Sequence, residues 1–278
     1  MVFRIILKTT SSHDYSQNKE SKSDSQKSKY QETINDILED ENKFENFRRN
    51  YRYREILEHV SYTLGKKYLN QINSRSNRIK FNLDWDTIKL NDSVGKPVLF
   101  RYPEIGRISP TTLRYTSVAL EILELFGSEI KTVAEIGAGY GGQARILDEF
   151  LDLEDYDCFD LPEVQNLIER YIKVVQPKMK VGFPTLDNSD SKSWDLVISN
   201  YAFSELPYLV QERYIKNVIL KSKNGFMIMN SGRTNITGRS TGKHSVSDLL
   251  RIIPNSRICE EAPLTGPDNF IIIWGNAS

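Results

Sequence analysis

The sequence predicts an α/β protein built on a mostly parallel sheet, and three observations support this. From residue 109 to the C-terminal end, short apolar segments alternate with amphipathic ones. A glycine-rich turn, EIGAGYGG at residues 135–142, follows the first of these apolar segments. A long stretch precedes them, and its apolar residues recur at helical steps. Strands that alternate with helices are typical of a parallel sheet with both faces covered.

The elements of the C-terminal part follow from local pattern. Ser109 and Pro110 have the chemistry of a helix start, and Gly127 is a plausible helix end. Further helices are expected at residues 143–151, 162–175, 208–221 and 245–253. Seven strands are expected, at residues 131–136, 156–159, 181–183, 194–199, 225–230, 257–260 and 270–274.

The N-terminal part divides into an arm and a helical region. Residues 1–31 are mostly polar and rich in Ser and Lys, which predicts a flexible arm. Residues 32–108 form an accessory cap: apolar residues within 34–69 recur every three or four positions, whereas 70–110 has the composition of an irregular connector. The cap is expected to shape an acceptor pocket or to form a homodimer contact. Residues 109–278 are the expected sheet domain.

Composition narrows the function classes. The 37 basic and 37 acidic side chains balance, so no overall basic field favours nucleic acid. The two cysteines, Cys158 and Cys259, are too few for a disulfide framework and fit a reducing compartment. No segment approaches the roughly 18 apolar residues of a membrane span. These features predict a cytoplasmic protein.

The glycine turn predicts a nucleotide-like ligand. Gly137, Gly139 and Gly142 spell G-x-G-x-x-G between a strand and a helix, and Asp160 ends the next strand, where an acid hydrogen-bonds ribose hydroxyls. Glu135 places a carboxylate beside the turn. That charge would repel the pyrophosphate of NAD but favour the sulfonium and ammonium of S-adenosylmethionine. S-adenosylmethionine is therefore the expected cofactor, and an NAD-dependent oxidoreductase is a distant alternative.

Several motifs together resemble a known family. VAEIGAGYGG, FDLPEV, WDLVISNYAFSEL and the final strand pair, within residues 95–275, resemble class I S-adenosylmethionine-dependent methyltransferases, which have a Rossmann-like fold. EIGAGYGGQARIL, SNYAFSEL and the lead-in GRISPTTLRY are most similar to sugar O-methyltransferases of bacterial polysaccharide gene clusters. DLPEV also resembles a stretch of phenolic O-methyltransferases. The expected function is methylation of a sugar or glycan hydroxyl; the alternatives are a phenolic or natural-product acceptor, or a non-catalytic S-adenosylmethionine-binding protein.

The resemblance implies a set of cofactor contacts. The glycines lie along the methionine part, Asp160 holds the ribose and Leu161 packs on the adenine. Arg114 meets the methionine carboxylate or makes only a surface ion pair. The implied cofactor residues are Glu135, Gly137, Gly139, Tyr140, Gly141, Asp160, Leu161, Asp187, Asn200 and Arg114. Tyr140 either lies over the cofactor or packs on the following helix, and Asp187 either touches the adenine amino group or is solvated.

Methyl transfer to a hydroxyl calls for a base. His244 follows the fifth strand and Glu205 lies in the loop after the fourth, so both are candidates at the carboxyl edge of the sheet. His59 is expected to be a packed or solvated histidine. Substrate contacts are expected from Tyr115, Tyr201 and Arg239, the last in a basic loop suited to a phosphorylated acceptor. No metal-ligand cluster can be recognised, so a metal-independent reaction is favoured, with magnesium left open.

Overall fold

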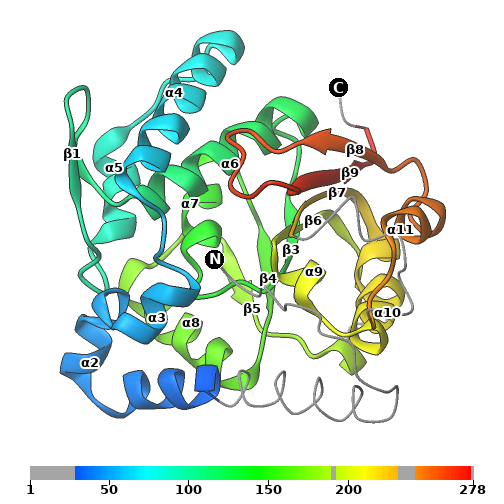
Figure 1. The fold of residues 1–278 in the computed structure, drawn as a ribbon, viewed down its shortest axis with the longest axis horizontal. Helices are drawn as coiled ribbons and strands as arrows, with labels where there is room; N and C mark the ends of the chain where they lie inside the picture. The colour runs from blue at the N-terminus through cyan, green and yellow to red at the C-terminus, as the bar shows by residue number, and fades with distance from the viewer. Residues whose placement is uncertain (1–28, 189–191, 231–241, 277–278) are drawn as a thin grey trace.

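A computed structural model describes residues 29–188, 192–230 and 242–276. Its centre is a seven-stranded sheet in the order β5-β4-β3-β6-β7-β9-β8 (Figure 1). β9 runs antiparallel to the other six strands, which are parallel to one another. The strands are β3 (Thr132–Ile136), β4 (Asp155–Phe159), β5 (Lys180–Gly182), β6 (Trp194–Asn200), β7 (Ser222–Met229), β8 (Arg257–Glu260) and β9 (Phe270–Trp274). The expected Rossmann-like, mostly parallel seven-stranded sheet is confirmed.

Helices cover both faces of the sheet, and successive side chains along each strand point alternately into two apolar cores. Val133 and Ile271 face one core, while their neighbours Ala134 and Ile272 face the other. The first core is covered by α6 (Pro110–Phe126), α7 (Gly142–Phe150) and α8 (Pro162–Val175), and the second by α10 (Tyr208–Asn217) and α11 (Val246–Ile252). The short helix α9 (Ala202–Glu205) follows β6.

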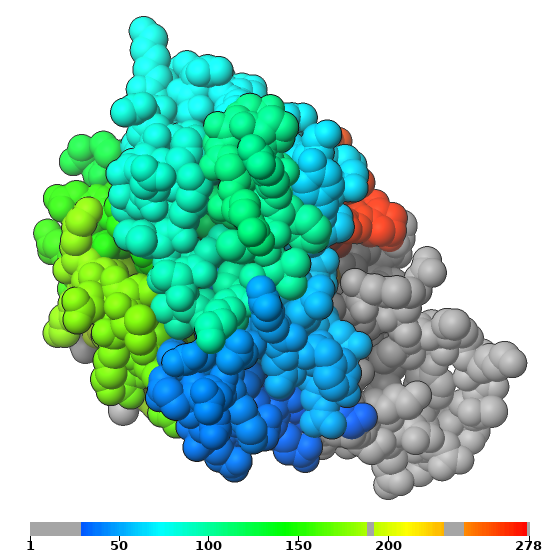
Figure 2. All heavy atoms as spheres, turned by 90° about the vertical axis from the view of Figure 1, so that its left-hand side faces the viewer, coloured from blue at the N-terminus to red at the C-terminus, as the bar shows by residue number. Residues whose placement is uncertain are grey.

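The N-terminal helices are present, and they extend the first core. A helix over 29–39 is followed by α2 (Glu41–Glu45), α3 (Tyr51–Ile56), α4 (Tyr62–Ile79) and α5 (Trp85–Lys89), and then by a hairpin of β1 (Phe100–Tyr102) and β2 (Gly106–Ile108). Figure 2 shows this N-terminal part, blue to cyan, over one side of the molecule. The short 3-10 turns are η1 (Phe47–Arg49), η2 (Leu90–Asp92), η3 (Leu186–Asn188) and η4 (Ile219–Lys221).

Two expectations for this region need correction. Residues 29–31 belong to a helix rather than to the arm, whose residues 1–28 lie outside the described part. Residues 70–110 are not an irregular connector, because α4 extends to Ile79 and is followed by α5 and the hairpin. The last turns of α4 are polar in sequence, yet Arg75 is buried there against α6 and donates to Glu121 at 2.9 Å. Tertiary pairing thus supports a helix that apolar spacing does not reveal.

A buried arginine joins the N-terminal helices to the sheet domain. Arg48 has no exposed surface and forms ion pairs with Glu58 at 2.5 Å and Asp92 at 3.1 Å. It also donates to the hydroxyl of Ser109, the N-cap of α6, at 3.1 Å. Two carboxylates of the N-terminal part thus compensate the charge of Arg48, and its bond to Ser109 reaches the sheet domain. Apolar residues of both parts also lie in one core, which crosses the expected boundary at residue 109.

Candidate cofactor site

The glycine turn lies at the carboxyl edge of the sheet, where the loops after three strands meet. Gly137, Gly139 and Gly141 have φ of 78°, 62° and 88°, a region that suits glycine. The Gly137 N–H donates to the Phe159 carbonyl at 2.8 Å, which joins this turn to the end of β4. A Cβ on Gly137 would lie 2.1 Å from the Cβ of Ala202, the first residue of α9, which follows β6. The turn therefore requires glycine for both conformation and space.

Asp160 stands at the end of β4, directly beside this turn. Its carboxylate accepts the N–H of Gly139 at 3.1 Å and the N–H of Leu161 at 2.8 Å. Burial raises the pKa of Asp160 to about 6, although these amides favour the charged form. A carboxylate has roughly four lone-pair positions, so the two amides leave acceptor capacity for the hydroxyls of a diol.

Glu135 is buried at the end of β3, and whether its carboxyl is ionised depends on its surroundings. It accepts the hydroxyl of Tyr156 at 2.7 Å, and the Asn200 amide lies 3.5 Å from its other oxygen. Burial raises the pKa of Glu135 to about 8, so the carboxyl is mostly protonated at pH 7. The sequence argument, which treated Glu135 as a fixed negative charge, needs this correction. A cation placed beside it would favour the carboxylate.

Two buried polar atoms at the same edge lack a hydrogen-bond partner among the described residues. One is the Oδ1 of Asn200, which follows β6, and the other is the Nε of Arg114 in α6. The charge of Arg114 also acts to lower the pKa of Glu135. Leaving such an atom unpaired costs about 1–3 kcal/mol, which a ligand would recover. Together with Glu135 and Asp160, these groups fit a ligand that carries a cation, a carboxylate and a diol.

Two tyrosines expected at the ligand are instead packed in the protein. Tyr140 has no exposed surface, and its hydroxyl accepts a hydrogen bond from Asn91 at 3.2 Å. Its ring meets Tyr171 edge to face at 5.1 Å, so it packs on the helices and does not lie over a cofactor. Tyr115 is only 4% exposed and stacks near the Arg114 guanidinium, 5.2 Å from its ring centre. A contact between Tyr115 and the substrate stays a prediction.

The adenine-side residues have different surroundings. Leu161 is the N-cap residue of α8 and is partly buried against the first core. Asp187 is exposed in η3 and pairs with Arg213 at 2.7 Å, and its contact with the adenine stays a prediction. Arg239 lies outside the described residues.

The two expected bases lie beyond β6 and β7. His244 is 3% exposed, stacks on Tyr208 at 4.3 Å, and its Nε2 lies 2.5 Å from Glu212. These contacts turn its ring toward α10, a placement that argues against a base at the glycine turn. Glu205 is exposed and accepts from Asn230 at 2.6 Å.

Tyr201 follows Asn200 in a strained conformation, with φ of 73°. Its hydroxyl donates to Glu261 at 2.5 Å, and the pKa of Tyr201 is raised, mainly by burial. Glu261 also accepts the Thr265 N–H at 2.9 Å. Sequence reasoning missed Glu261, because it lies 60 residues from its partner, in a loop without a motif.

Sequence reasoning also missed Leu57 and Gln143. Leu57, at the end of α3, would lie 3.1 Å from a Cβ on Gly139 and so covers the glycine turn. The Gln143 side chain donates to the Tyr115 carbonyl at 3.2 Å and fixes α6 against α7. No local motif marks either residue; only the fold brings them to the site.

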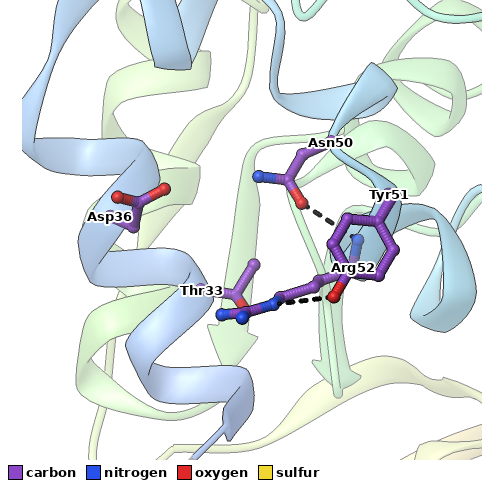
Figure 3. A pocket seen from close by; sticks show the side chains of 5 residues that line it. All are labelled: Thr33, Asp36, Asn50, Tyr51 and Arg52. Carbon is purple, nitrogen blue, oxygen red and sulfur yellow. Dashed lines mark hydrogen bonds between the residues drawn. The ribbon is translucent and has the colours of Figure 1, made fainter.

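Two pockets in the described part lie among the N-terminal helices. The first, about 280 Å³, is lined by Thr33, Asp36, Asn50, Tyr51 and Arg52 (Figure 3). Its polar groups already serve local structure, since Asn50 caps α3 and Asp36 pairs with Lys43. The second, about 310 Å³, lies between the end of α3 and the start of α6. Among the described residues, no group of three or more His, Cys, Asp or Glu is placed to hold a metal ion.

No helix in the described ranges has the length and apolar character that a membrane crossing requires.

The sequence and the fold were compared with those of known proteins. Neither a protein-family model nor a curated protein matches the sequence. Similar solved structures include an O-methyltransferase family protein from Burkholderia thailandensis, with 12% identity over 60% of this chain and 59% of that one, and a TM-score of 0.43. This chain thus spans about three fifths of that protein.

Two further structures are similar at the same level. The methyltransferase domain of bacterial CtHen1 has 11% identity over 58% of this chain and 97% of its own, with a TM-score of 0.45. An O-methyltransferase from neocarzinostatin biosynthesis, solved with S-adenosyl-L-homocysteine and 1,4-dihydroxy-2-naphthoic acid, has 11% identity over 60% of this chain and 58% of its own, with a TM-score of 0.39.

Proposed function

We propose that this protein is an S-adenosylmethionine-dependent O-methyltransferase. One observation carries the proposal: at the carboxyl edge of a Rossmann-like sheet, the glycine turn is flanked by Glu135, Asp160 and the unpaired groups of Asn200 and Arg114. Each group matches a different part of one ligand. Asp160 suits the ribose diol, Arg114 suits the methionine carboxylate, and Glu135 with the Asn200 oxygen suits the cationic groups.

The charge pattern favours this cofactor over NAD. A pyrophosphate at the turn would stand beside Asp160 and near Glu135, and its two negative charges would oppose ionisation of both buried carboxyls. A sulfonium ion has the opposite effect, because it stabilises the carboxylate form of Glu135. The amide of Asn200, 3.5 Å from Glu135, keeps that carboxyl oriented toward the loop after β6.

The chemistry of the step asks little of the protein beyond alignment. Bound S-adenosylmethionine supplies a methyl group on a positively charged sulfur, which is already a good leaving group. The chain has to orient the acceptor oxygen in line with that methyl group, exclude water, and accept the hydroxyl proton. Leu57, packed on the glycine turn from the N-terminal helices, excludes water from that side.

The acceptor class is a sugar or glycan hydroxyl in this proposal. Its support is the resemblance of residues 95–275 to sugar O-methyltransferases, together with the absence of an N-P-P-Y motif at Asn200, which would suit a planar nitrogen acceptor. A phenolic hydroxyl is the second candidate. It is supported by the DLPEV stretch, whose Leu161 and Pro162 begin α8 beside Asp160.

Calorimetric titration tests the cofactor assignment. S-adenosylmethionine and S-adenosylhomocysteine should bind, and at one hundred times its Kd either should stabilise the fold by about 2.7 kcal/mol. NAD should leave the melting temperature unchanged. Binding of NAD with no binding of the two sulfur ligands would contradict the proposed function. Asp160→Asn should weaken both sulfur ligands, because the ribose loses its charged acceptor.

A further inference from the structure

The second pocket is lined by residues that neighbour, in sequence, two residues of the proposed cofactor site. Its lining includes Glu58, His59 and Val60, which directly follow Leu57 on the glycine turn. It also includes Pro110 and Thr111, which begin α6 one helical turn before Arg114. The pocket and the cofactor site therefore share two walls, the end of α3 and the first turns of α6.

The chemistry of the lining combines aromatic surface with hydrogen-bonding groups. The rings of Tyr62 and Phe100 lie 5.6 Å apart and are 37% and 36% exposed. His59 and Ser61 lie on the same rim and are exposed. A volume of about 310 Å³ is at the small end of ligand pockets, which suits one ring-sized group.

His59 has one ring nitrogen available as an acceptor. Partial desolvation, with the charge of Arg114 adding to it, lowers the pKa of His59 below its ordinary value, so the imidazole is neutral at pH 7. A neutral imidazole has one unprotonated ring nitrogen, which can accept a hydroxyl proton.

We infer that this pocket binds the methyl acceptor as a hydroxylated, non-aromatic ring, with one ring face on Tyr62 and Phe100 and the reacting hydroxyl donating to His59. The inference rests on the proposed function. As the oxygen lone pair forms the new C–O bond, the S–C bond breaks and its electron pair stays on sulfur. The O–H electron pair stays on oxygen, and the proton passes to the free nitrogen of His59 and then to solvent.

His59 is a weak base, but the proton it receives is acidic at that moment. The hydroxyl oxygen becomes positively charged as the methyl group arrives, so its proton leaves readily to a group of low basicity. Weak bases give modest assistance, and His59→Ala should lower kcat/KM by about 10- to 100-fold. The Kd of S-adenosylhomocysteine should change less than twofold in this variant, because His59 is not part of the proposed cofactor site.

Saturation-transfer NMR on the full chain loaded with S-adenosylhomocysteine tests the pocket without requiring turnover. The probes are methyl α-glucoside, methyl α-rhamnoside, N-acetylglucosamine and catechol. At least one sugar should receive saturation in the wild-type protein. Phe100→Ala should reduce that signal at least fivefold, whereas Tyr51→Ala, which removes a 67% exposed aromatic ring outside the pocket, should not.

The outcomes separate the two proposals. Failure of S-adenosylhomocysteine to bind would overturn the proposed function. Three results would overturn the pocket inference while S-adenosylhomocysteine still binds and the proposed function stands. These are no saturation of any sugar, saturation of catechol alone, and a sugar signal that Phe100→Ala leaves unchanged. An unchanged melting temperature with S-adenosylhomocysteine bound shows that each variant is folded.

Discussion

Replacing Glu135 by glutamine should stabilise the protein in the absence of cofactor, by an amount that grows with pH. Glu135 is 1% exposed, and its folded-state pKa of about 8 compares with 4.5 for a free glutamate. Because the folded pKa is raised, the stability contributed by the protonated group is full below pH 4.5 and is lost as pH rises through 8. Glutamine is nearly the same size, remains neutral, and still accepts the hydroxyl of Tyr156.

The magnitude follows from the two pKa values. Each unit of difference between the folded and unfolded pKa of Glu135 corresponds to about 1.4 kcal/mol. Relative to pH values below 4.5, the free energy of unfolding is therefore lower by about 3 kcal/mol at pH 7 and by about 5 kcal/mol above pH 8. Glu135→Gln removes that loss. For a chain of 278 residues, about 3 kcal/mol corresponds to a rise of about 5 °C in Tm.

Urea unfolding at pH 5, 6, 7, 8 and 9 measures the effect, since the midpoint converts to a free energy of unfolding through the slope m. The matched control is Glu104→Gln, on the exposed turn of the β1–β2 hairpin, which should show no pH-dependent difference from wild type. A difference between Glu135→Gln and wild type that stays constant from pH 5 to 9 would refute the reasoning.

The same protonation should couple to cofactor binding. If the sulfonium lies beside Glu135, S-adenosylmethionine binding at pH 7 should release more protons than binding of neutral-sulfur S-adenosylhomocysteine. Calorimetry in buffers of different ionisation enthalpy measures that release. In Glu135→Gln the extra release should vanish and the preference for S-adenosylmethionine should fall. Equal proton release for both ligands in the wild-type protein would place the sulfonium away from Glu135.

Three further outcomes are expected. Arg48→Met leaves the buried carboxylates of Glu58 and Asp92 without their ion-pair partner and should lower the free energy of unfolding by about 3–5 kcal/mol. A loss below about 1 kcal/mol, measured by urea unfolding, would show that this buried network contributes little to stability. Gly137→Ala should raise the Kd of S-adenosylhomocysteine at least tenfold in titration, because its Cβ would clash with Ala202, whereas Gly106→Ala, at φ of 82° with open space around it, should only lower Tm; equal Kd values would contradict the site. His244→Phe keeps the stack on Tyr208 and should leave kcat within threefold, and a loss beyond tenfold would restore His244 as the base.

Much of the sheet domain could be predicted because its signals are local. Apolar runs of five to seven residues such as those of β3 and β6, with Pro or Gly beside the helices that follow, mark where each element begins and ends. The glycine turn was placed correctly for the same reason: three positive-φ glycines between a strand and a helix leave few other conformations. Asp160 followed, since parallel strands end at a common edge.

The N-terminal region was harder, because its stability comes from distant partners. The polar end of α4 is helical since Arg75 finds Glu121 in α6, 46 residues away. Tyr140 sits inside the glycine motif, but Asn91 and Tyr171 draw its side chain into the core, 49 and 31 residues away in sequence. Pattern rules that use neighbouring residues contain no information on such pairs.

Local patterns in the sequence suffice to predict the sheet, its alternation of helices and strands, and the edge at which we propose that a ligand binds, because periodicity and glycine chemistry act over a few residues. The state of the groups at that edge depends on the folded structure. Burial sets whether Glu135 carries a charge, and packing turns His244 toward α10. Folding also brings His59, from a segment that looked like an ordinary helix end, to a pocket beside the glycine turn. Desolvation and long-range contact depend on the whole fold, so no local pattern encodes them.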